Sequence, residues 1–297
     1  MTNAIGPDFS HWDGTINFDE LASSGASFAW FKIGQGLRED PQLNRSLREA
    51  NNYGIPAGGY WYYDALVHPV SQAQTLTEIV RGKALPLGIA VDYEDPRVGT
   101  YGGWRHLAVF MQKVMDLLQI VPERMPLYTT YYYWMDHRPS PAWNVASYFW
   151  FKKFPLWLAQ YNGLSAPNRI PGPWFDWLFW QYSKMGDPVK YGSQKMSVDL
   201  SQFHGDQAAL DRWLVGAPLP PAPPPTVYRG VVRAPAGLNV RTEPSPTATK
   251  IGALRDGAAL TGDELRVMGV NKWLHLTAPL VGWAAQEYQG TELIRLA

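Results

Sequence analysis

The sequence predicts an α/β protein in two parts: an irregular, TIM-like (β/α) barrel that lacks its last helices, followed by a small all-β barrel. Three observations lead to this fold class. Eight short apolar or aromatic runs recur before residue 217, helix-like stretches alternate with the early runs, and a proline-rich segment then precedes a region of brief strand-like pieces. Strands that alternate with helices indicate βα units, and eight such strands suffice for a closed barrel.

The expected barrel strands are short, and several open with Pro or Gly. They cover residues 7–12, 28–34, 57–63, 87–94, 126–133, 155–161, 177–183 and 196–203. Helices are expected at residues 18–23, 42–52, 69–81, 104–118, 143–152 and 206–214. The connections 162–176 and 184–195 show no helical period, so the late crossovers are expected to be loops. A Rossmann-like open sheet is the alternative, but Gly34-Gln35-Gly36 lacks the third Gly of a phosphate-binding loop.

The domain boundary is expected at residues 217–226, which contain six prolines and no charge. Such a run favours polyproline II and acts as a semi-rigid spacer. We therefore expect a first domain at residues 1–216 and a second at 227–297. Brief strands of the second domain are expected at residues 237–241, 250–254, 272–276 and 282–285.

Composition excludes several classes of function. The 297 residues are 46% hydrophobic and 18% charged, which provides an ample core and argues against a disordered chain or a coiled coil. Lys+Arg and Asp+Glu both number 26, so the broad charge of a general nucleic-acid or anionic-membrane binder is missing. Because there is no Cys, disulfides, thiolate zinc sites and cysteine nucleophiles are excluded. A catalyst in this chain has to use oxygen or imidazole groups.

The opening segment MTNAIGPDFSHWDG has neither the basic nor the apolar part of a signal peptide. No apolar run reaches the roughly 18 residues of a membrane span. We therefore expect a protein that is made in a cytoplasm without a signal peptide and does not insert into membranes. No internal repeat suggests a multimer, so a monomer is expected.

The segment most informative about chemistry is residues 87–96, LGIAVDYEDP. Side chains alternate along a strand, so Asp92 and Glu94 share one face with Gly88 and Ala90, while Leu87 shares the other face with the remaining apolar residues. On an inner barrel face this leaves a space below two carboxyl groups at the strand's carboxyl end, where barrel enzymes carry out catalysis. Two acids about 6.5–7 Å apart push their pKa values apart, so that one stays protonated, as in glycosidases. An exposed acidic strand end that pairs with Lys or Arg is the alternative, and the spacing alone does not decide.

Two further acids, Asp8 and Asp199, lie in the first and the last expected strand. These strands are neighbours in a closed eight-stranded barrel, so both acids would lie at the same rim as Asp92 and Glu94. A single Asp at a strand end is usually a turn or cap residue. The convergence of four acids from three strands is what predicts a catalytic site.

Other catalytic motifs are missing. The six His are scattered, without an HExxH or His-x-His pattern, so neither a metal nor a cofactor is expected. No Gly-x-Ser-x-Gly or Ser-x-x-Lys motif surrounds a Ser. This disfavours serine acyl transfer, and with it an amidase or a peptidase.

Seven short motifs within residues 5–215 follow one another in the same order as in a known protein family. They are residues 8–18 (DFSHWDGTINF), 59–62 (GYWY), 91–94 (VDYE), 126–128 (PLY), 156–161 (LWLAQY), 179–183 (FWQYS) and 198–200 (VDL) with Phe203. Through them the sequence resembles glycoside hydrolase family 25, the Chalaropsis-type lysozymes found among phage endolysins and bacterial autolysins. The family's irregular barrel, with five βα units followed by strands without helices, agrees with the expected late loops.

The resemblance implies hydrolysis of the β-1,4 bond between N-acetylmuramic acid and N-acetylglucosamine in peptidoglycan. It implies that Glu94 is the general acid that protonates the leaving oxygen. Asp92 would stabilise positive charge on the sugar, or on an oxazolinium formed by the substrate's 2-acetamido group. Asp8 and Asp199 would complete the acidic floor. Whether an enzyme carboxylate or the acetamido group is the nucleophile stays open at this point.

The resemblance also implies a substrate groove. The positions that match its lining are Tyr60, Tyr62, Tyr128, Trp157, Tyr161 and Gln181. Each ring could instead belong to the barrel core. The sequence departs from the family at Asp13, where members often carry Gln, and at Trp61, where they often carry His. These departures leave the catalytic acids intact but change contacts at the rim.

The second domain resembles a bacterial SH3 domain at residues 237–245, 272–274 and 281–284. Such modules bind the wall and raise the concentration of the enzyme at its substrate; a stabilising appendage without a ligand is the alternative. Together the two resemblances predict a modular muramidase that acts on the cell wall, with peptidoglycan as its partner, and in particular a phage endolysin. A bacterial autolysin and a non-catalytic wall-binding or virion structural protein are the alternatives.

Overall fold

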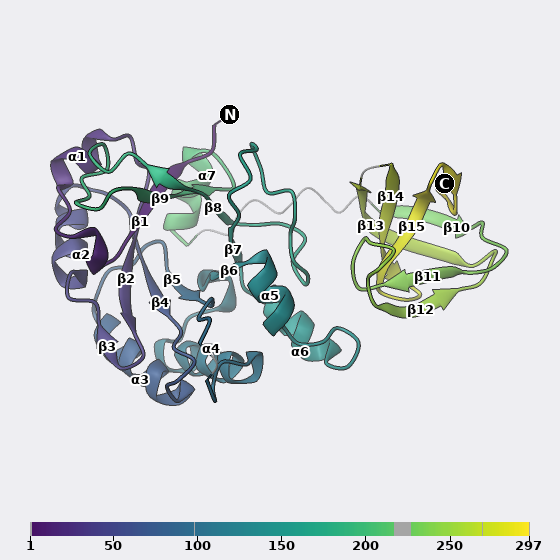
Figure 1. Ribbon diagram of the computed structural model, residues 1–297, viewed down its shortest axis with the longest axis horizontal. Helices are drawn as coiled ribbons and strands as arrows, with labels where there is room; N and C mark the ends of the chain where they lie inside the picture. Colours follow the sequence, from purple (N-terminus) through teal and green to yellow (C-terminus); the bar gives the residue numbers. More distant parts are fainter. Residues whose placement is uncertain (1, 98, 217–226, 269, 297) are drawn as a thin grey trace. The chain divides into compact units, whose positions relative to one another are not determined.

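The computed structural model describes residues 2–97, 99–216, 227–268 and 270–296. The chain forms two compact units, one built mainly from residues 1–218 and the other mainly from residues 219–297 (Figure 1). Each unit has its own hydrophobic core. The linker expected at residues 217–226 lies outside the described residues.

Eight strands of the first unit close into a barrel. They are β1 (Ile5–Phe9), β2 (Ala29–Gln35), β4 (Ala57–Tyr62), β5 (Ile89–Asp92), β6 (Leu127–Thr130), β7 (Leu156–Ala159), β8 (Phe179–Gly186) and β9 (Val198–Phe203). The strands follow one another around the barrel in chain order, and β1 closes it by pairing with both β2 and β9. The short β3 (Arg38–Glu39) forms a hairpin with the end of β2. The predicted α/β barrel is confirmed.

The last strand departs from the parallel arrangement. Neighbours from β1 to β8 pair in parallel, whereas β9 runs antiparallel to both β8 and β1. Residues 160–178 and 187–197, all of them described, contain no helix, so the expectation of late loops is confirmed. A parallel return needs a crossover of a dozen or more residues, and the short connection 187–197 instead leads back antiparallel.

The helices of the first unit surround the barrel (Figure 1). They are α1 (Phe18–Ser23), α2 (Leu43–Asn52), α3 (Pro69–Val80), α4 (Trp104–Leu118), α5 (Tyr131–His137), α6 (Val145–Trp150) and α7 (Gln207–Leu214). Polar side chains fix several starts: Asn17, Thr130 and Asp206 each accept a hydrogen bond from a backbone N–H of the first turn. Among the described residues, no helix has the length and apolar character to cross a membrane.

Two local predictions are wrong. The strand expected at residues 126–133 ends at Thr130, because the Thr130 side chain accepts a hydrogen bond from the Tyr133 backbone at 3.1 Å and starts α5. Leu87, expected on the outer face, packs in the inner cluster together with Ala90. Gly88 has a φ of 93°, which interrupts the strand alternation just before β5 begins.

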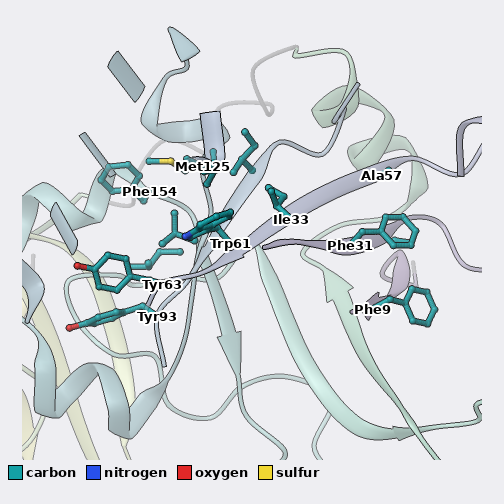
Figure 2. Packing of buried hydrophobic residues seen from close by; sticks show 14 of the residues in the cluster. Phe9, Phe31, Ile33, Ala57, Trp61, Tyr63, Tyr93, Met125 and Phe154 are labelled. Atoms are coloured by element: carbon teal, nitrogen blue, oxygen red, sulfur yellow. The ribbon is translucent and has the colours of Figure 1, made fainter. Parts of the chain in front are cut away.

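Two apolar layers lie on either side of the barrel wall. The outer layer packs the strand residues Phe31 and Trp61, together with Tyr93 directly after β5, against the helices (Figure 2). The inner layer fills the barrel with aromatic rings, among them Trp30 and Trp157, whose ring centroids lie 4.9 Å apart. Large aromatic rings bury about 150–250 Å² each and dominate core energetics. This inner layer, the aromatic floor, closes the barrel below the rim at which the site lies.

In the described part of the second unit, all regular elements are strands. They are β10 (Tyr228–Val232), β11 (Leu238–Arg241), β12 (Lys250–Leu254), β13 (Ala259–Met268), β14 (Asn271–Ala278), β15 (Gly282–Tyr288), β16 (Thr291–Glu292) and β17 (Ile294–Leu296). All recorded pairs are antiparallel, in the order β12-β11-β15-β14-β13-β10-β17, with β16 beside β15. The four expected strands occur as β11, β12, β14 and β15, whereas β10, β13, β16 and β17 were not expected.

Candidate active site

The four predicted acids come together at one rim of the barrel. Asp8 of β1 and Asp199 of β9 are direct partners across the strand pair. Asp92 is the last residue of β5, and Glu94 follows two positions later. Because β9 is reversed, Asp199 lies near the amino end of its strand and still reaches the rim formed by the carboxyl ends of the parallel strands. The backbone alone therefore places carboxyl groups from three strands around one opening.

Asp92 is the most buried of these acids, with 6% of its surface exposed. Burial first, and the nearby charge of Glu94 second, raise the pKa of Asp92 well above its ordinary value, while the Lys32 ammonium opposes this rise. Its Oδ1 atom is buried without a hydrogen-bond partner among the described residues. Buried polar atoms are nearly always paired in folded proteins. The Asp92 Oδ1 is therefore an unsatisfied acceptor that the fold holds away from solvent.

Glu94 is half-buried and keeps its proton more tightly than an exposed Glu. Burial and then the negative charge of Asp199 raise its pKa, whereas Lys32 and a hydrogen bond with the Tyr128 hydroxyl lower it. A carboxyl group whose pKa is raised toward neutrality can act as a general acid at ordinary pH. The cleavage of a glycosidic bond requires a protonated carboxyl group, and the raised pKa of Glu94 favours this form.

Gln181 orients the groups at the centre of the rim. Its amide Nε2 donates to Asp8 Oδ2 at 2.9 Å, and its Oε1 accepts hydrogen bonds from the hydroxyls of Tyr128 and Tyr161. Two donors on the oxygen fix the amide so that its nitrogen faces Asp8. The pKa of Asp8 is nevertheless raised, by burial first and by the charge of Asp199 second. A network of this kind holds the rim in one geometry.

The structure places the six expected groove residues at different depths. Tyr161 is 49% exposed, and Tyr60 and Tyr62 on β4 are half-buried. Tyr128 and Gln181 are buried, with their polar ends in the hydrogen-bond network. The expectation for Trp157 is not met, because its ring is 2% exposed, packs in the aromatic floor and donates its Nε1–H to Ser201 Oγ at 3.0 Å. Trp157 therefore supports the site from below.

Sequence reasoning missed Lys32, the cation beside the acids. Lys32 lies on β2, and its Nζ donates to Gln35 Oε1 at 3.2 Å and lies 5.0 Å from the centroid of the Tyr62 ring. Burial lowers its pKa, while the negative charges of Asp92 and other acids raise it. The signal was available, because Lys32 has the same strand parity as the inward-facing Trp30.

Trp12 was also missed as a site residue. It lies in the short 3-10 helix His11–Asp13, directly after β1 and therefore at the rim that carries Asp8. Its side chain is 73% exposed, although large apolar rings usually find cover. Asp13 fixes this turn, because its carboxylate accepts a hydrogen bond from the Ser10 backbone at 2.9 Å. An exposed indole beside the acids offers a stacking surface for a sugar ring.

A closed barrel with an aromatic floor and four interacting carboxyl groups at one rim defines a class of proteins: barrel hydrolases that act through paired acids. A search of the described residues gives no group of three or more His, Asp or Glu side chains arranged to hold a metal ion. The family model described as Glycosyl hydrolases family 25 matches residues 7–189. The chain belongs to this family.

Known relatives agree with this assignment. Lysozyme M1 of Streptomyces globisporus is 28% identical over 219 residues, which cover 69% of this chain and 69% of that protein. The crystal structure of a lysozyme from Streptomyces coelicolor matches with a TM-score of 0.57 at 24% identity, over 73% of this chain and 99% of that one. The catalytic domain of an endolysin from a bacteriophage of Listeria monocytogenes matches with a TM-score of 0.56 at 19% identity, over 72% and 98%. These two structures share the fold of the first unit.

Proposed function

We propose that the chain is a peptidoglycan hydrolase, a muramidase that cleaves the β-1,4 bond between N-acetylmuramic acid and N-acetylglucosamine. The observation that carries the proposal is the half-buried Glu94, whose pKa is raised by burial and by Asp199 at a rim that also holds Asp92 and Asp8. Membership of family 25 supports the same reaction. Proteins similar to this chain are named lysozyme or muramidase.

In this mechanism Glu94 donates its proton to the glycosidic oxygen as the bond to the leaving sugar breaks. The sugar that stays behind develops positive charge, and an ionised Asp92 stabilises it. Before substrate binds, burial favours the protonated form of Asp92. A substrate N–H that donates to the Asp92 carboxylate would favour the ionised form instead, because a hydrogen bond to a carboxylate stabilises its charge.

Asp8, Asp199 and Gln181 hold the reacting groups in place. The charge of Asp199 helps Glu94 to retain its proton, and Gln181 links Asp8 to the hydroxyls of Tyr128 and Tyr161. Either an enzyme carboxylate or the 2-acetamido group of the substrate attacks the anomeric carbon as the leaving sugar departs, and water then hydrolyses the glycosyl-enzyme or oxazolinium intermediate. Walls whose muramic acid lacks the N-acetyl group separate the two routes, because only the second route needs that group.

The test of this function is the Glu94→Gln variant assayed on purified walls. We expect its rate of release of reducing sugar ends to fall by about 10²–10⁴-fold, the usual contribution of a positioned general acid. Glu123→Gln, an exposed site on the turn Pro122–Arg124 before β6, is the matched control and should keep full activity. Undiminished hydrolysis by Glu94→Gln would disprove the proposed role, and the release of new amino groups would indicate an amidase or a peptidase.

We also propose that the second unit is an SH3-type wall-binding module. Its separate all-β core and the sequence match at residues 237–245 support this role. A module that binds the wall raises the local concentration of the enzyme at its substrate. The full-length Glu94→Gln protein should therefore sediment with purified walls, and a chain that ends at Gly216 should sediment much less.

We further propose that the enzyme acts on the wall as a monomeric endolysin made in the cytoplasm of an infected host. The endolysin and autolysin among the similar structures share its fold and leave a bacterial autolysin as the second candidate. Size-exclusion chromatography with light scattering of the full chain tests the monomer. A mass twice that of one chain would contradict it.

A further inference from the structure

One face of the second unit gathers three arginines around a shallow apolar hollow. Arg229 and Val231 lie on β10, and Arg233 directly follows the end of this strand. Because strand side chains alternate, all three point away from the side on which the core residue Val232 lies. Arg295 on β17 is the direct partner of Val231 in the neighbouring strand. Arg295 thus lies diagonal to both Arg229 and Arg233, roughly 7–8 Å from each, whereas Arg229 and Arg233 lie roughly 13 Å from each other along the strand.

These arginines line one hollow of about 510 Å³ across β10, β13 and β17. Its floor is uncharged and includes Val231, Ala259 and Leu260, and no acid is among its described lining residues. All three arginine side chains are exposed. The hollow is therefore open to solvent and carries charge of a single sign.

The positive charge is largely without counter-charge. Among the described residues, Arg229 and Arg233 have no carboxylate partner, and Arg295 Nε approaches only Glu292 Oε2, at 3.6 Å. Like charges on neighbouring sheet positions destabilise a sheet. An arrangement of charges that costs stability and makes no internal contact indicates a ligand outside the chain.

We propose that this hollow binds the phosphodiester groups of an anionic wall polymer. The inference rests on the proposed wall-binding function of the second unit and names its ligand. Guanidinium groups match phosphate oxygens in bidentate geometry, and three of them spaced along one face can contact successive phosphates of one chain. The apolar floor suits the carbon segments between the phosphates. Guanidinium groups also pair with carboxylates, so the carboxylates of wall peptides are the competing ligand, which acid-treated walls distinguish from phosphodiesters.

The experiment measures how the full-length Glu94→Gln protein is retained on walls, so that digestion does not interfere. Detergent-extracted walls are used with and without hydrofluoric acid treatment, which removes phosphodiester-linked polymers and leaves the peptidoglycan. The test variant adds Arg229→Gln and Arg233→Gln. The control adds Lys250→Gln and Arg255→Gln, two exposed cations of the same unit that do not line the hollow. Circular dichroism of both proteins verifies that they fold.

On intact walls we expect the Arg229→Gln/Arg233→Gln protein to bind at least about tenfold more weakly than its parent, since hydrogen bonds between charged groups are lost. The control should stay within about twofold of the parent. On acid-treated walls the parent should fall to the level of the test variant. Retention of the parent should also weaken as salt is raised, because the contact is between exposed charges.

Four other outcomes overturn the proposal, each in a different way. Equal retention of test variant and parent on intact walls would show that the arginines do not bind the wall. A loss in the test variant that persists on acid-treated walls would assign the hollow to peptidoglycan, while the wall-binding function would stand. A parent that is not retained on any wall would disprove the wall-binding function itself. Duplex DNA is included as a competitor, and binding of DNA as tight as binding of the intact wall would point to unselective attraction of anions.

Discussion

The floor and the rim of the barrel are built by the same strands but differ in what burial does for them. In the floor, Trp30 and Trp157 bury apolar surface, which stabilises the fold. At the rim, Asp8 and Asp92 bury carboxyl groups, and burial raises the pKa of both. The floor is thus expected to provide stability, whereas the rim gives up stability to hold carboxyl groups in a reactive state.

Replacement of a rim acid should have the largest effect on activity. It tests most directly whether the rim gives up stability for reactivity. We expect Asp92→Asn to lower kcat by about 10²–10³-fold, since the charge that stabilises the developing cation is lost. The same variant should be more stable than the parent at neutral pH by about 1 kcal/mol, because it no longer buries a carboxylate. Reducing-end release and urea unfolding measure the two effects. A variant both inactive and strongly destabilised would mean that Asp92 is a structural residue.

The stability gain of Asp92→Asn should depend on pH. The folded-state pKa of Asp92 is raised above its ordinary value of 3.8, so the folded state binds this proton more tightly than the unfolded state. The parent therefore loses stability as the pH rises above that ordinary value and through the folded-state pKa, and regains it as the pH falls. The difference in unfolding free energy between variant and parent should narrow from pH 7 toward pH 4. A constant difference would contradict burial as the cause.

Replacement of a floor residue should show the opposite signature. Trp157→Ala removes a ring that is 2% exposed, and we expect a loss of about 3–5 kcal/mol in the free energy of unfolding. Trp157→Phe keeps most of the packing and should lose less. Thermal and urea unfolding measure both variants. If Trp157→Ala unfolds like the parent but binds glycan poorly, the ring belongs to the groove after all.

The sequence predicts the positions of the rim acids better than the directions of the strands. Asp92 and Glu94 could be found because alternation along one strand and a stop at Pro96 are local patterns. The reversal of β9 could not, since strand direction depends on how a loop without a helix crosses the sheet. The neighbourhood of Asp8 and Asp199 was still predicted, because closure of a barrel brings its first and last strands together whatever their direction.

Burial was harder to predict than position. Trp157 and Tyr161 lie in one motif, yet one ring is in the floor and the other is half exposed. Residues 157 and 161 have the same parity in the sequence, but β7 ends at Ala159, so Trp157 lies within the strand and Tyr161 lies beyond its end. The inward position of Leu87 was not predicted, because Gly88 has a positive φ. A residue in this conformation interrupts the strand alternation, so the side chain before it points to the opposite face. These features depend on tertiary geometry that no local pattern records.

Lys32 provides a smaller test of the rim. Its charge lowers the pKa of Asp92 and of Glu94, so Lys32→Met should raise both. We therefore expect both limbs of the pH–activity profile to move to higher pH, with lower activity on the acidic side because Asp92 stays protonated longer. Lys153→Met, an exposed site on the turn Phe151–Lys153, is the control and should leave the profile in place. An unshifted profile for Lys32→Met would show that the ammonium does not influence the acids during turnover.

The smallest effect is expected at the outer edge of the rim, where Trp12 is 73% exposed. Removal of this ring takes little from the core, so Trp12→Ala should unfold within about 0.5 kcal/mol of the parent. If the indole stacks on a sugar ring, KM on soluble glycan fragments should rise by roughly two- to tenfold with little change in kcat, because stacking binds ground state and transition state alike. Trp143→Ala, which removes an indole that is 87% exposed, controls for the loss of a surface Trp. An unchanged KM would leave Trp12 outside the substrate site, whereas a fall in kcat alone would mean that the turn His11–Asp13 positions the acids rather than the sugar.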